Sequence, residues 1–167
     1  MGKIAVYPGS FDPITFGHLD IVERALDCFD GVILAIAADI PKDALFTVEE
    51  RMEMARIALR GTPDVVVESF SGLLVNYVAS AKATVILRGL RATSDFEYEF
   101  HMASTNKNLN ENVETLFMMA NKDYFFVSSR TIKEVAGLGG SVTGLVPECV
   151  ERKLKERFAS RGKGKRG

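Results

Sequence analysis

The stretch YPGSFDPITFGHLDI, residues 7–21, places one of the two histidines of the chain at the start of a predicted helix. The free backbone N–H groups and the dipole of a helix N-terminus favour anions, and His18 there can donate a hydrogen bond to a phosphate. Gly9 lets a ligand approach the backbone closely, and Ser10 adds a hydroxyl. A helix-capping turn with a surface histidine explains the same residues equally well, so this stretch alone does not decide between the two interpretations.

Two arginines follow a later apolar run, in LRGLRATSDFEYEF. Arg88 ends the predicted strand, and Arg91 follows after Gly89 and Leu90. Two guanidinium groups at a strand end suggest bidentate binding of an oxygen anion. The alternative is a pair of surface arginines that balance the acidic residues Asp95, Glu97 and Glu99. We favour the anion site, because a strand end in an open sheet points at the crevice where ligands bind.

Two further loops contain groups of the same kind. Lys42, in DIPKDALF, is more simply interpreted as a solvated lysine than as a ligand-binding group. Ser128 and Ser129 precede a predicted helix, where a serine is by default an N-cap, and Arg130 and Lys133 lie close by. Two helix starts and several basic residues at one sheet edge suggest a site for a polyphosphate.

The motifs of other nucleotide-binding and hydrolytic classes are absent from the sequence. It contains no Walker A motif, no Gly-x-Gly-x-x-Gly after the first strand and no Gly-x-Ser-x-Gly. The second histidine, His101, lies inside a predicted helix, and we expect no catalytic role for it.

Short apolar runs alternate with longer amphipathic segments, and the pattern predicts the elements that must position these residues. Strands are expected at residues 3–7, 32–38, 64–70, 84–88 and 114–119. Helices are expected at residues 18–29, 47–59, 73–82, 94–109, 129–136 and 147–159. The predicted fold is α/β: a Rossmann-like, open, parallel five-stranded sheet with helices on both faces. In such a sheet, ligands bind beyond the carboxyl ends of the strands, where the loops described above lie.

Length and composition are those of one globular domain. The 167 residues are 47% hydrophobic and 26% charged, with a formal net charge of -1, which argues against a nucleic-acid coat protein. We expect a single domain over residues 1–160 and a basic, disordered tail over 161–167. No apolar stretch is long enough to span a membrane. Cys28 and Cys149 are expected to be buried free thiols on helix faces, which suits a reducing cytoplasm.

The segment TFGH, residues 15–18, is similar to the Thr/His-x-Gly-His signature of the nucleotidyltransferase superfamily. Together with YPGSFDPITFGHLDI, FTVEERMEMA, RGLRATSDFEYEF and VSSRTIKEVA, it resembles the bacterial phosphopantetheine adenylyltransferases from about Lys3 to Glu151. The resemblance implies transfer of adenylate from ATP to 4′-phosphopantetheine, which yields dephospho-coenzyme A and pyrophosphate in the penultimate step of coenzyme A biosynthesis. It also implies a homohexamer, assistance by Mg²⁺ and coenzyme A as a feedback ligand.

The resemblance also implies roles for individual residues. His18 matches a transition-state-stabilising histidine, and Lys42 and Arg88 match the groups that hold the phosphopantetheine phosphate. The implied ATP-binding residues are Ser10, Phe11, His18, Gly89, Leu90, Arg91, Glu99, Tyr124, Phe125, Phe126, Val127, Ser128, Ser129 and Arg130. The implied phosphopantetheine-binding residues are Ser10, Lys42, Leu74, Arg88 and Asn106, with Tyr98 beside them. No protein ligand for Mg²⁺ is expected, because substrate phosphates and water would hold it.

Two positions depart from the family pattern. Arg130 stands where many members have a serine or threonine, and Gly72 replaces a position that is commonly acidic. The alternatives are a sister enzyme, such as a nicotinamide-mononucleotide adenylyltransferase, and a non-catalytic nucleotide-binding regulator on the same fold.

Overall fold

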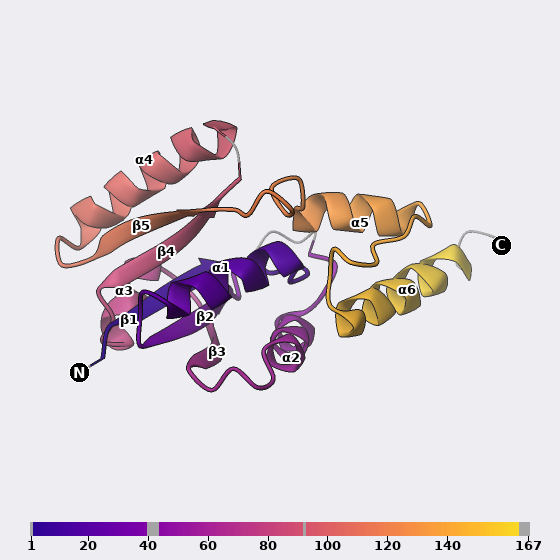
Figure 1. Ribbon diagram of the computed structural model, residues 1–167, viewed down its shortest axis with the longest axis horizontal. Coiled ribbons are helices and arrows are strands. Elements are labelled where there is room, and N and C mark those ends of the chain that lie inside the picture. Colours follow the sequence, from indigo (N-terminus) through magenta and orange to yellow (C-terminus); the bar gives the residue numbers. More distant parts are fainter. Residues whose placement is uncertain (1, 40–43, 92, 164–167) are drawn as a thin grey trace.

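A computed structural model describes residues 2–39, 44–91 and 93–163, and its centre is a five-stranded sheet (Figure 1). The strands are β1 (Ile4–Gly9), β2 (Gly31–Ala37), β3 (Val65–Phe70), β4 (Val85–Leu90) and β5 (Glu114–Met119). All neighbouring strands are parallel, in the order β3-β2-β1-β4-β5. The predicted α/β fold is therefore confirmed, including the number and direction of the strands.

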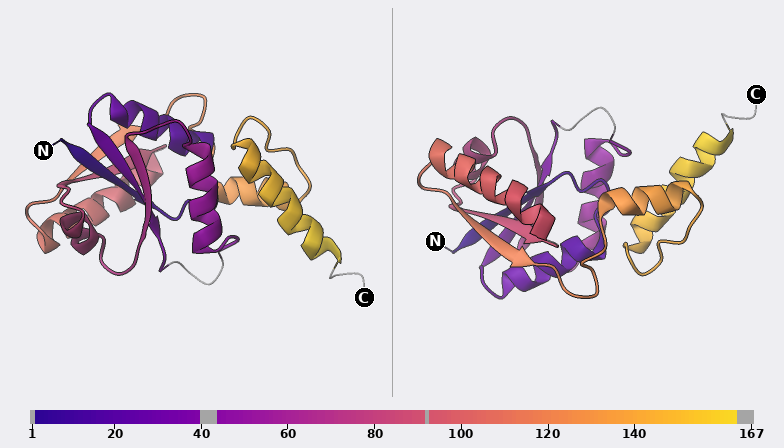
Figure 2. Two further views of the ribbon diagram at one scale, coloured as in Figure 1. Left: turned by 90° about the horizontal axis from the view of Figure 1, so that it is seen from below. Right: turned by 90° about the horizontal axis from the view of Figure 1, so that it is seen from above.

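Helices cover both faces of the sheet, as predicted. They are α1 (Phe16–Leu26), α2 (Val48–Ala58), α3 (Leu74–Ser80), α4 (Thr93–Leu109), α5 (Ser129–Gly137) and α6 (Glu148–Lys163). One apolar core joins α1 and α2 to one face, and a smaller core joins α3 to the opposite face, where α4 also packs. Helices α5 and α6 lie beyond the carboxyl edge of the strands and extend the larger core (Figure 2).

Local sequence signals account for where the helices begin. At the start of α2, the Thr47 backbone N–H donates to the Glu50 carboxylate at 2.9 Å, and the Glu50 N–H donates to Thr47 Oγ1 at 3.3 Å. This reciprocal pair is the capping box that the sequence predicts. The N-caps of α1 and α5 are Thr15 and Ser128. Both of these helix starts face the carboxyl edge of the sheet, so the fold brings two anion-favouring termini to one side of the molecule.

The structure corrects two expectations. Cys28 is exposed rather than buried, because α1 ends at Leu26 and its apolar periodicity does not continue to this residue. Cys149 is buried, as expected. Helix α6 continues to Lys163, so the first three residues of the expected basic tail are helical, and residues 164–167 lie outside the described residues.

The two edge strands are less covered than the strands between them. Val66 of β3 is 50% exposed, and Leu116 and Met119 of β5 are 47% and 59% exposed. No helix in the described part of the chain is both long and apolar enough to cross a lipid bilayer.

Candidate functional site

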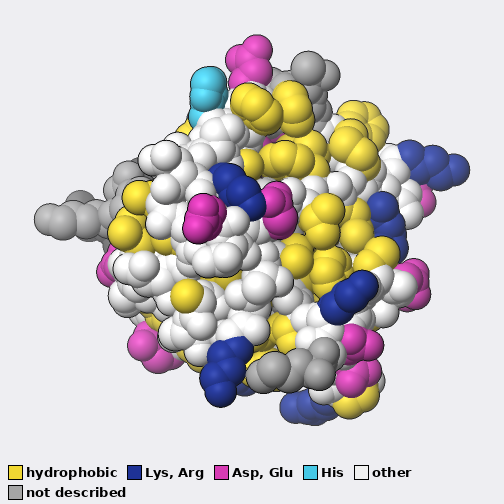
Figure 3. Space-filling model, turned by 90° about the vertical axis from the view of Figure 1, so that its left-hand side faces the viewer, with side chains coloured by type: hydrophobic (Ala, Val, Ile, Leu, Met, Phe, Trp, Pro, Cys, Tyr) yellow, Lys and Arg dark blue, Asp and Glu magenta, His cyan; other side chains and the backbone are white. Residues whose placement is uncertain are grey.

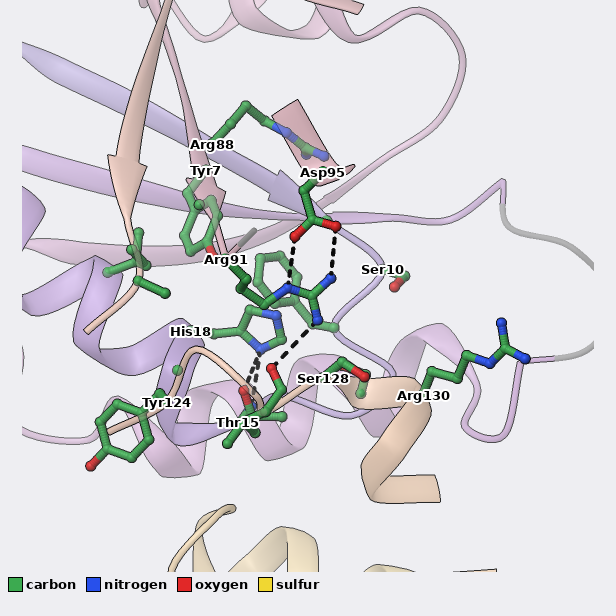
Figure 4. Close-up of a pocket in the computed structure, with 18 of the residues that line it drawn as sticks. Tyr7, Ser10, Thr15, His18, Arg88, Arg91, Asp95, Tyr124, Ser128 and Arg130 are labelled. Carbon is green, nitrogen blue, oxygen red and sulfur yellow. Dashed lines mark hydrogen bonds and ion pairs between the residues drawn. The ribbon is translucent and has the colours of Figure 1, made fainter. Parts of the chain in front are cut away.

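The candidate site lies where the order of the strands reverses. Chain connections lead outward from β1 to β2 and β3 on one side, and to β4 and β5 on the other. The crevice above such a switch point is where open α/β sheets bind ligands. A pocket of about 540 Å³ occupies this place (Figure 4). The residues of the sheet that line it are Tyr7, Pro8 and Gly9 of β1 and Arg88 and Gly89 of β4.

His18 lies in this pocket on the first turn of α1. Its Nδ1 accepts a hydrogen bond from the Thr15 backbone N–H at 3.0 Å, and Thr15 Oγ1 lies 3.1 Å from the same nitrogen (Figure 4). Because Nδ1 is an acceptor, the proton of the neutral ring resides on Nε2. The helix cap therefore fixes both the tautomer and the orientation of His18, and it leaves Nε2 as a hydrogen-bond donor.

The surroundings of His18 keep its ring neutral. Burial, together with the positive charges of the nearby Arg91 and Arg88, lowers the pKa of His18 to about 4. Phe11 packs edge-on against the imidazole, with ring centroids 5.0 Å apart, and has a backbone φ of 44°. At neutral pH the histidine is thus a rigid neutral donor rather than a cation.

Arg88 is held by two partners on opposite sides. Its Nε and Nη2 donate to the two carboxylate oxygens of Glu99 at 2.6 and 2.5 Å, and its Nη1 donates to the Pro8 carbonyl at 2.8 Å. Pairing of the arginines with nearby acids, which the sequence offered as the alternative interpretation, therefore does occur. It does not remove Arg88 from the pocket, because Arg88 is still one of the residues that line it.

Arg91 is held less firmly than Arg88. It pairs with Asp95, one turn later, at 3.1 Å, and its side chain is 41% exposed. A longer contact of 3.5 Å joins Nη1 to the Val127 carbonyl. Arg91 thus links the end of β4 to the segment before α5.

The start of α5 forms the opposite wall of the pocket. Ser128 Oγ accepts the Thr131 N–H at 2.9 Å as an N-cap, and the Ser129 hydroxyl donates to the Pro13 carbonyl at 2.7 Å. At the start of α1, a Cβ on Gly17 would lie 3.4 Å from the Cβ of Tyr124, so the two walls approach closely there. The two helix N-termini therefore face a common space.

Two buried charges that the sequence analysis did not identify support the first loop. The carboxylate of Asp12 accepts the backbone N–H groups of Leu45 and Phe46 at 2.9 Å each, and it pairs with Lys133 at 2.7 Å. Arg51, 1% exposed, donates to the carbonyls of Ser10 at 2.6 Å and Ala37 at 2.9 Å. Arg51 precedes the buried Met54 and Ala55 by three and four positions, and this helical spacing was the available signal that its side chain faces inward.

A second, smaller pocket adjoins the first. It has a volume of about 80 Å³, and Leu74 of α3 and Asn106 of α4 line it. Arg88, Tyr98 and Glu99 line both pockets. Leu74, Arg88 and Asn106, three of the residues that the sequence assigned to phosphopantetheine, therefore lie beside those assigned to ATP, with Arg88 at the junction.

Most of the residues that the sequence assigned to ATP line the larger pocket. They are Ser10, Phe11, His18, Gly89, Arg91, Glu99, Tyr124, Val127, Ser128, Ser129 and Arg130. Leu90, Phe125 and Phe126 line neither pocket. Leu90 is buried in the sheet, and the side chains of Phe125 and Phe126 are 57% and 55% exposed at the surface.

The remaining sequence predictions concern single residues. Lys42 lies outside the described residues. His101 is exposed on α4 and lines neither pocket. Tyr7 lines the larger pocket but was not assigned to it from the sequence.

The two departures from the family pattern have different structural settings. Gly72 has a backbone φ of 78°, a conformation that side chains rarely adopt, and its N–H donates to Asp39 at 2.7 Å. Arg130 has a side chain that is 88% exposed, pairs with Glu134, and points away from His18 (Figure 4).

Comparison with known proteins adds independent evidence. A family model described as cytidylyltransferase-like matches residues 6–135. A phosphopantetheine adenylyltransferase of Carboxydothermus hydrogenoformans is 57% identical over 160 residues, which are 96% of this chain and 99% of the relative. The enzyme of the same name from Syntrophus aciditrophicus is 55% identical and covers 99% of this chain and 100% of its own length.

A solved structure from Vibrio parahaemolyticus shows the same fold. It is described as a candidate nicotinate-nucleotide adenylyltransferase and has a TM-score of 0.69. The similarity covers 93% of this chain and 99% of that one, at 17% sequence identity.

Proposed function

Because the chain belongs to the phosphopantetheine adenylyltransferase family, we propose that it transfers adenylate from ATP to 4′-phosphopantetheine. The products are dephospho-coenzyme A and pyrophosphate. The observation that supports this most is the pair of adjoining pockets, which share Arg88, Tyr98 and Glu99. A protein that binds a nucleotide alone has no need of a second pocket that opens at the same arginine.

The chemistry is an in-line attack by a phosphate oxygen of phosphopantetheine on the α-phosphorus of ATP. A phosphate monoester is already anionic near neutral pH, so the reaction needs no strong general base. The barrier is lowered by holding two anions in line and by stabilising the charge that spreads over the α-phosphate.

Arg88 and Lys42 hold the phosphate of the acceptor in this scheme. An arginine has five N–H donors, and three of those of Arg88 are engaged by Glu99 and Pro8. The other two N–H groups remain for a phosphate, while the fixed ones prevent the guanidinium from turning. Positive charge at this point offsets the repulsion between the two substrates.

His18 acts on the other reacting phosphate. Its Nε2 proton is available because Thr15 occupies Nδ1, and its neutral state makes it a donor of fixed direction. Donation to an oxygen of the α-phosphate is strongest when that oxygen gains charge in the transition state, which is the condition for acceleration. The N-terminus of α1 adds its dipole at the same place.

Mg²⁺ is proposed as the metal that accompanies ATP. Two carboxylates line the larger pocket, and both are engaged: Asp95 pairs with Arg91, and Glu99 pairs with Arg88. In the described part of the chain, no three metal-ligating side chains of the His, Cys, Asp or Glu types converge. This donor set fits an ion held by phosphate oxygens and water, the usual arrangement for Mg²⁺ bound with a nucleotide.

We further propose a homohexamer in the cytoplasm, with coenzyme A as a feedback ligand. Hydrophobic side chains gather on the face of the molecule shown in Figure 3. Exposed apolar residues of α4 and β5 are Phe96, Phe100, Met102, Leu109, Leu116 and Met119. Such patches on a globular chain often mark interfaces. Light scattering in solution tests the state directly, and a monomeric mass would contradict it.

One assay tests the activity. Purified protein is mixed with ATP, Mg²⁺ and one acceptor, and pyrophosphate release is followed. We expect release with 4′-phosphopantetheine, and neither with nicotinamide mononucleotide nor without an acceptor. Release with nicotinamide mononucleotide would indicate the sister enzyme, and no release with either acceptor would indicate a nucleotide-binding regulator.

A further inference from the structure

Tyr7 lines the larger pocket, and its hydroxyl has no part in any of the roles proposed for the other residues. The residue is 6% exposed, and it lines the pocket from β1. Its hydroxyl makes no hydrogen bond to residues 2–39, 44–91 or 93–163. In that part of the chain, every polar side-chain atom that is completely shielded from solvent does have a hydrogen-bond partner. The hydroxyl therefore opens into the pocket instead of being sealed within the core.

The ring and the hydroxyl of Tyr7 have separate surroundings. The ring packs edge-on against Phe11, with centroids 5.3 Å apart, and lies 6.4 Å from the His18 ring. The hydroxyl oxygen lies 3.4 Å from the position that a Cβ on Gly89 would take, so the bare backbone of Gly89 leaves room beside it. Packing accounts for an aromatic ring here, but a phenylalanine would pack equally well. The hydroxyl needs another explanation, because buried tyrosine hydroxyls usually have a hydrogen-bond partner.

The charges near the hydroxyl indicate an anionic partner. Arg88 and Arg91 both interact electrostatically with Tyr7, and Figure 4 shows Tyr7 between Arg88 and His18. Glu99 and Asp20 also face it, but Glu99 is paired with Arg88, and Asp20 is paired with Arg24. Burial raises the pKa of Tyr7 well above its usual value, so the hydroxyl keeps its proton and can donate.

We propose that Tyr7 is a substrate-binding residue whose hydroxyl donates a hydrogen bond to a phosphate oxygen of the bound nucleotide. The inference rests on the proposed adenylyl transfer and adds a third donor to the α-phosphate region, beside His18 and the α1 N-terminus.

The test is Tyr7→Phe, which removes one oxygen and keeps the ring. A hydrogen bond to a charged group contributes about 1.5–3 kcal/mol, so we expect the ATP dissociation constant or the kcat/KM for ATP to worsen about 10- to 100-fold. The thermal midpoint should stay near that of the unchanged protein. Tyr77→Phe is the matched control, because Tyr77 lies outside both pockets and donates to Glu68. We expect that variant to retain full activity.

Two further measurements, an ATP titration and a comparison with 2′-deoxy-ATP, distinguish the possible outcomes. ATP is first titrated calorimetrically without an acceptor, so that binding is measured even if the unchanged protein has no transferase activity. Full-strength ATP binding and turnover in Tyr7→Phe would overturn the inference while leaving the proposed function intact. A loss with ATP that disappears with 2′-deoxy-ATP would assign the hydroxyl to the ribose and overturn the phosphate contact. An equal loss with both nucleotides supports it.

Discussion

The two sides of the larger pocket differ in how firmly their polar groups are held. On the β1–α1 side, in which we include Arg88 of the neighbouring strand β4, Thr15 fixes His18, and Glu99 and the Pro8 carbonyl fix Arg88. On the α5 side, Arg91 and Arg130 each pair with a carboxylate four residues later and are 41% and 88% exposed. Exposed pairs of this kind contribute a few tenths of a kcal/mol and open readily.

This difference indicates that the two sides have different roles, one in catalysis and the other in binding ATP. Groups that already occupy their final positions need little reorganisation when the transition state forms. Such preorganised electrostatic stabilisation is usually the largest contribution to catalysis when charge develops in the transition state. Groups that can exchange an exposed ion pair for a new partner at little cost in free energy are suited to binding a mobile triphosphate. Changes to His18 or to the contacts that fix Arg88 should therefore lower kcat, and changes on the α5 side should mainly raise the KM for ATP.

The largest effect is expected from His18→Ala. Loss of one preorganised donor to a charged transition state costs about 2.7–4 kcal/mol of barrier, which is a fall in kcat of about 100- to 1,000-fold. ATP binding, measured by calorimetry, should change much less. A variant that turns over at nearly the original rate, or one that loses ATP binding in proportion to kcat, would show that the firmly held side does not perform the chemistry.

The next largest effect is expected from Glu99→Gln. The amide keeps the shape of the side chain but cannot accept both N–H donors of Arg88 as a carboxylate does. Arg88 then loses its fixed position, and kcat/KM for phosphopantetheine should fall about 10-fold or more, in line with the 1.5–3 kcal/mol of a charged hydrogen bond. Glu97→Gln, an exposed change on the same helix, is the control. Equal kinetics in the two variants would mean that Arg88 needs no support.

A smaller effect concerns stability and pH. The pKa of His18 is about 4 in the folded chain against an ordinary value of 6.5, so between these values the unfolded chain binds a proton that the folded chain does not. Stability should therefore fall as the pH falls from about 6.5 to about 4, by at most about 1.4 kcal/mol per pH unit. Chemical denaturation at pH 7 and pH 5 measures this fall, and His18→Asn should reduce it. An identical fall in both proteins would mean that His18 is not held neutral.

The smallest effect is expected from Arg130→Ser. The guanidinium is exposed and points away from His18, so its removal should raise the KM for ATP by no more than about threefold and leave kcat unchanged. Steady-state kinetics at low and high salt provide the measurement, with any difference shrinking at high salt. A large loss of kcat would place Arg130 among the firmly held groups and remove the contrast between the two sides.

The fold could be predicted from the sequence because its signals are local. Apolar runs and the Thr47–Glu50 capping box locate the strands and helices, and their alternation implies a parallel sheet. The positions of His18 and Arg88 at the carboxyl edge follow from that topology. Strand ends were less certain: β1 continues to Gly9, two residues beyond the predicted end, because Pro8 and Gly9 still pair with β2.

The supporting contacts of the site could not be predicted in the same way. Asp12 meets Lys133, and Arg51 meets the Ser10 carbonyl, across long stretches of chain, and no local pattern encodes those distances. Tyr7 appears in the sequence as one apolar position of a buried strand, and its hydroxyl acquires meaning when Arg88 and Gly89 of β4 lie beside it. The sequence predicted groups that we propose bind the substrates, whereas the structure identifies the side chains that hold those groups in place.

The reverse reaction tests the central claim most directly. The unchanged protein is incubated with dephospho-coenzyme A, pyrophosphate and Mg²⁺, and ³¹P NMR follows the nucleotide. We predict that ATP and 4′-phosphopantetheine appear together and in equal amounts, and that NAD⁺ with pyrophosphate yields no ATP. Absence of ATP from dephospho-coenzyme A, or its formation from NAD⁺, would contradict the account.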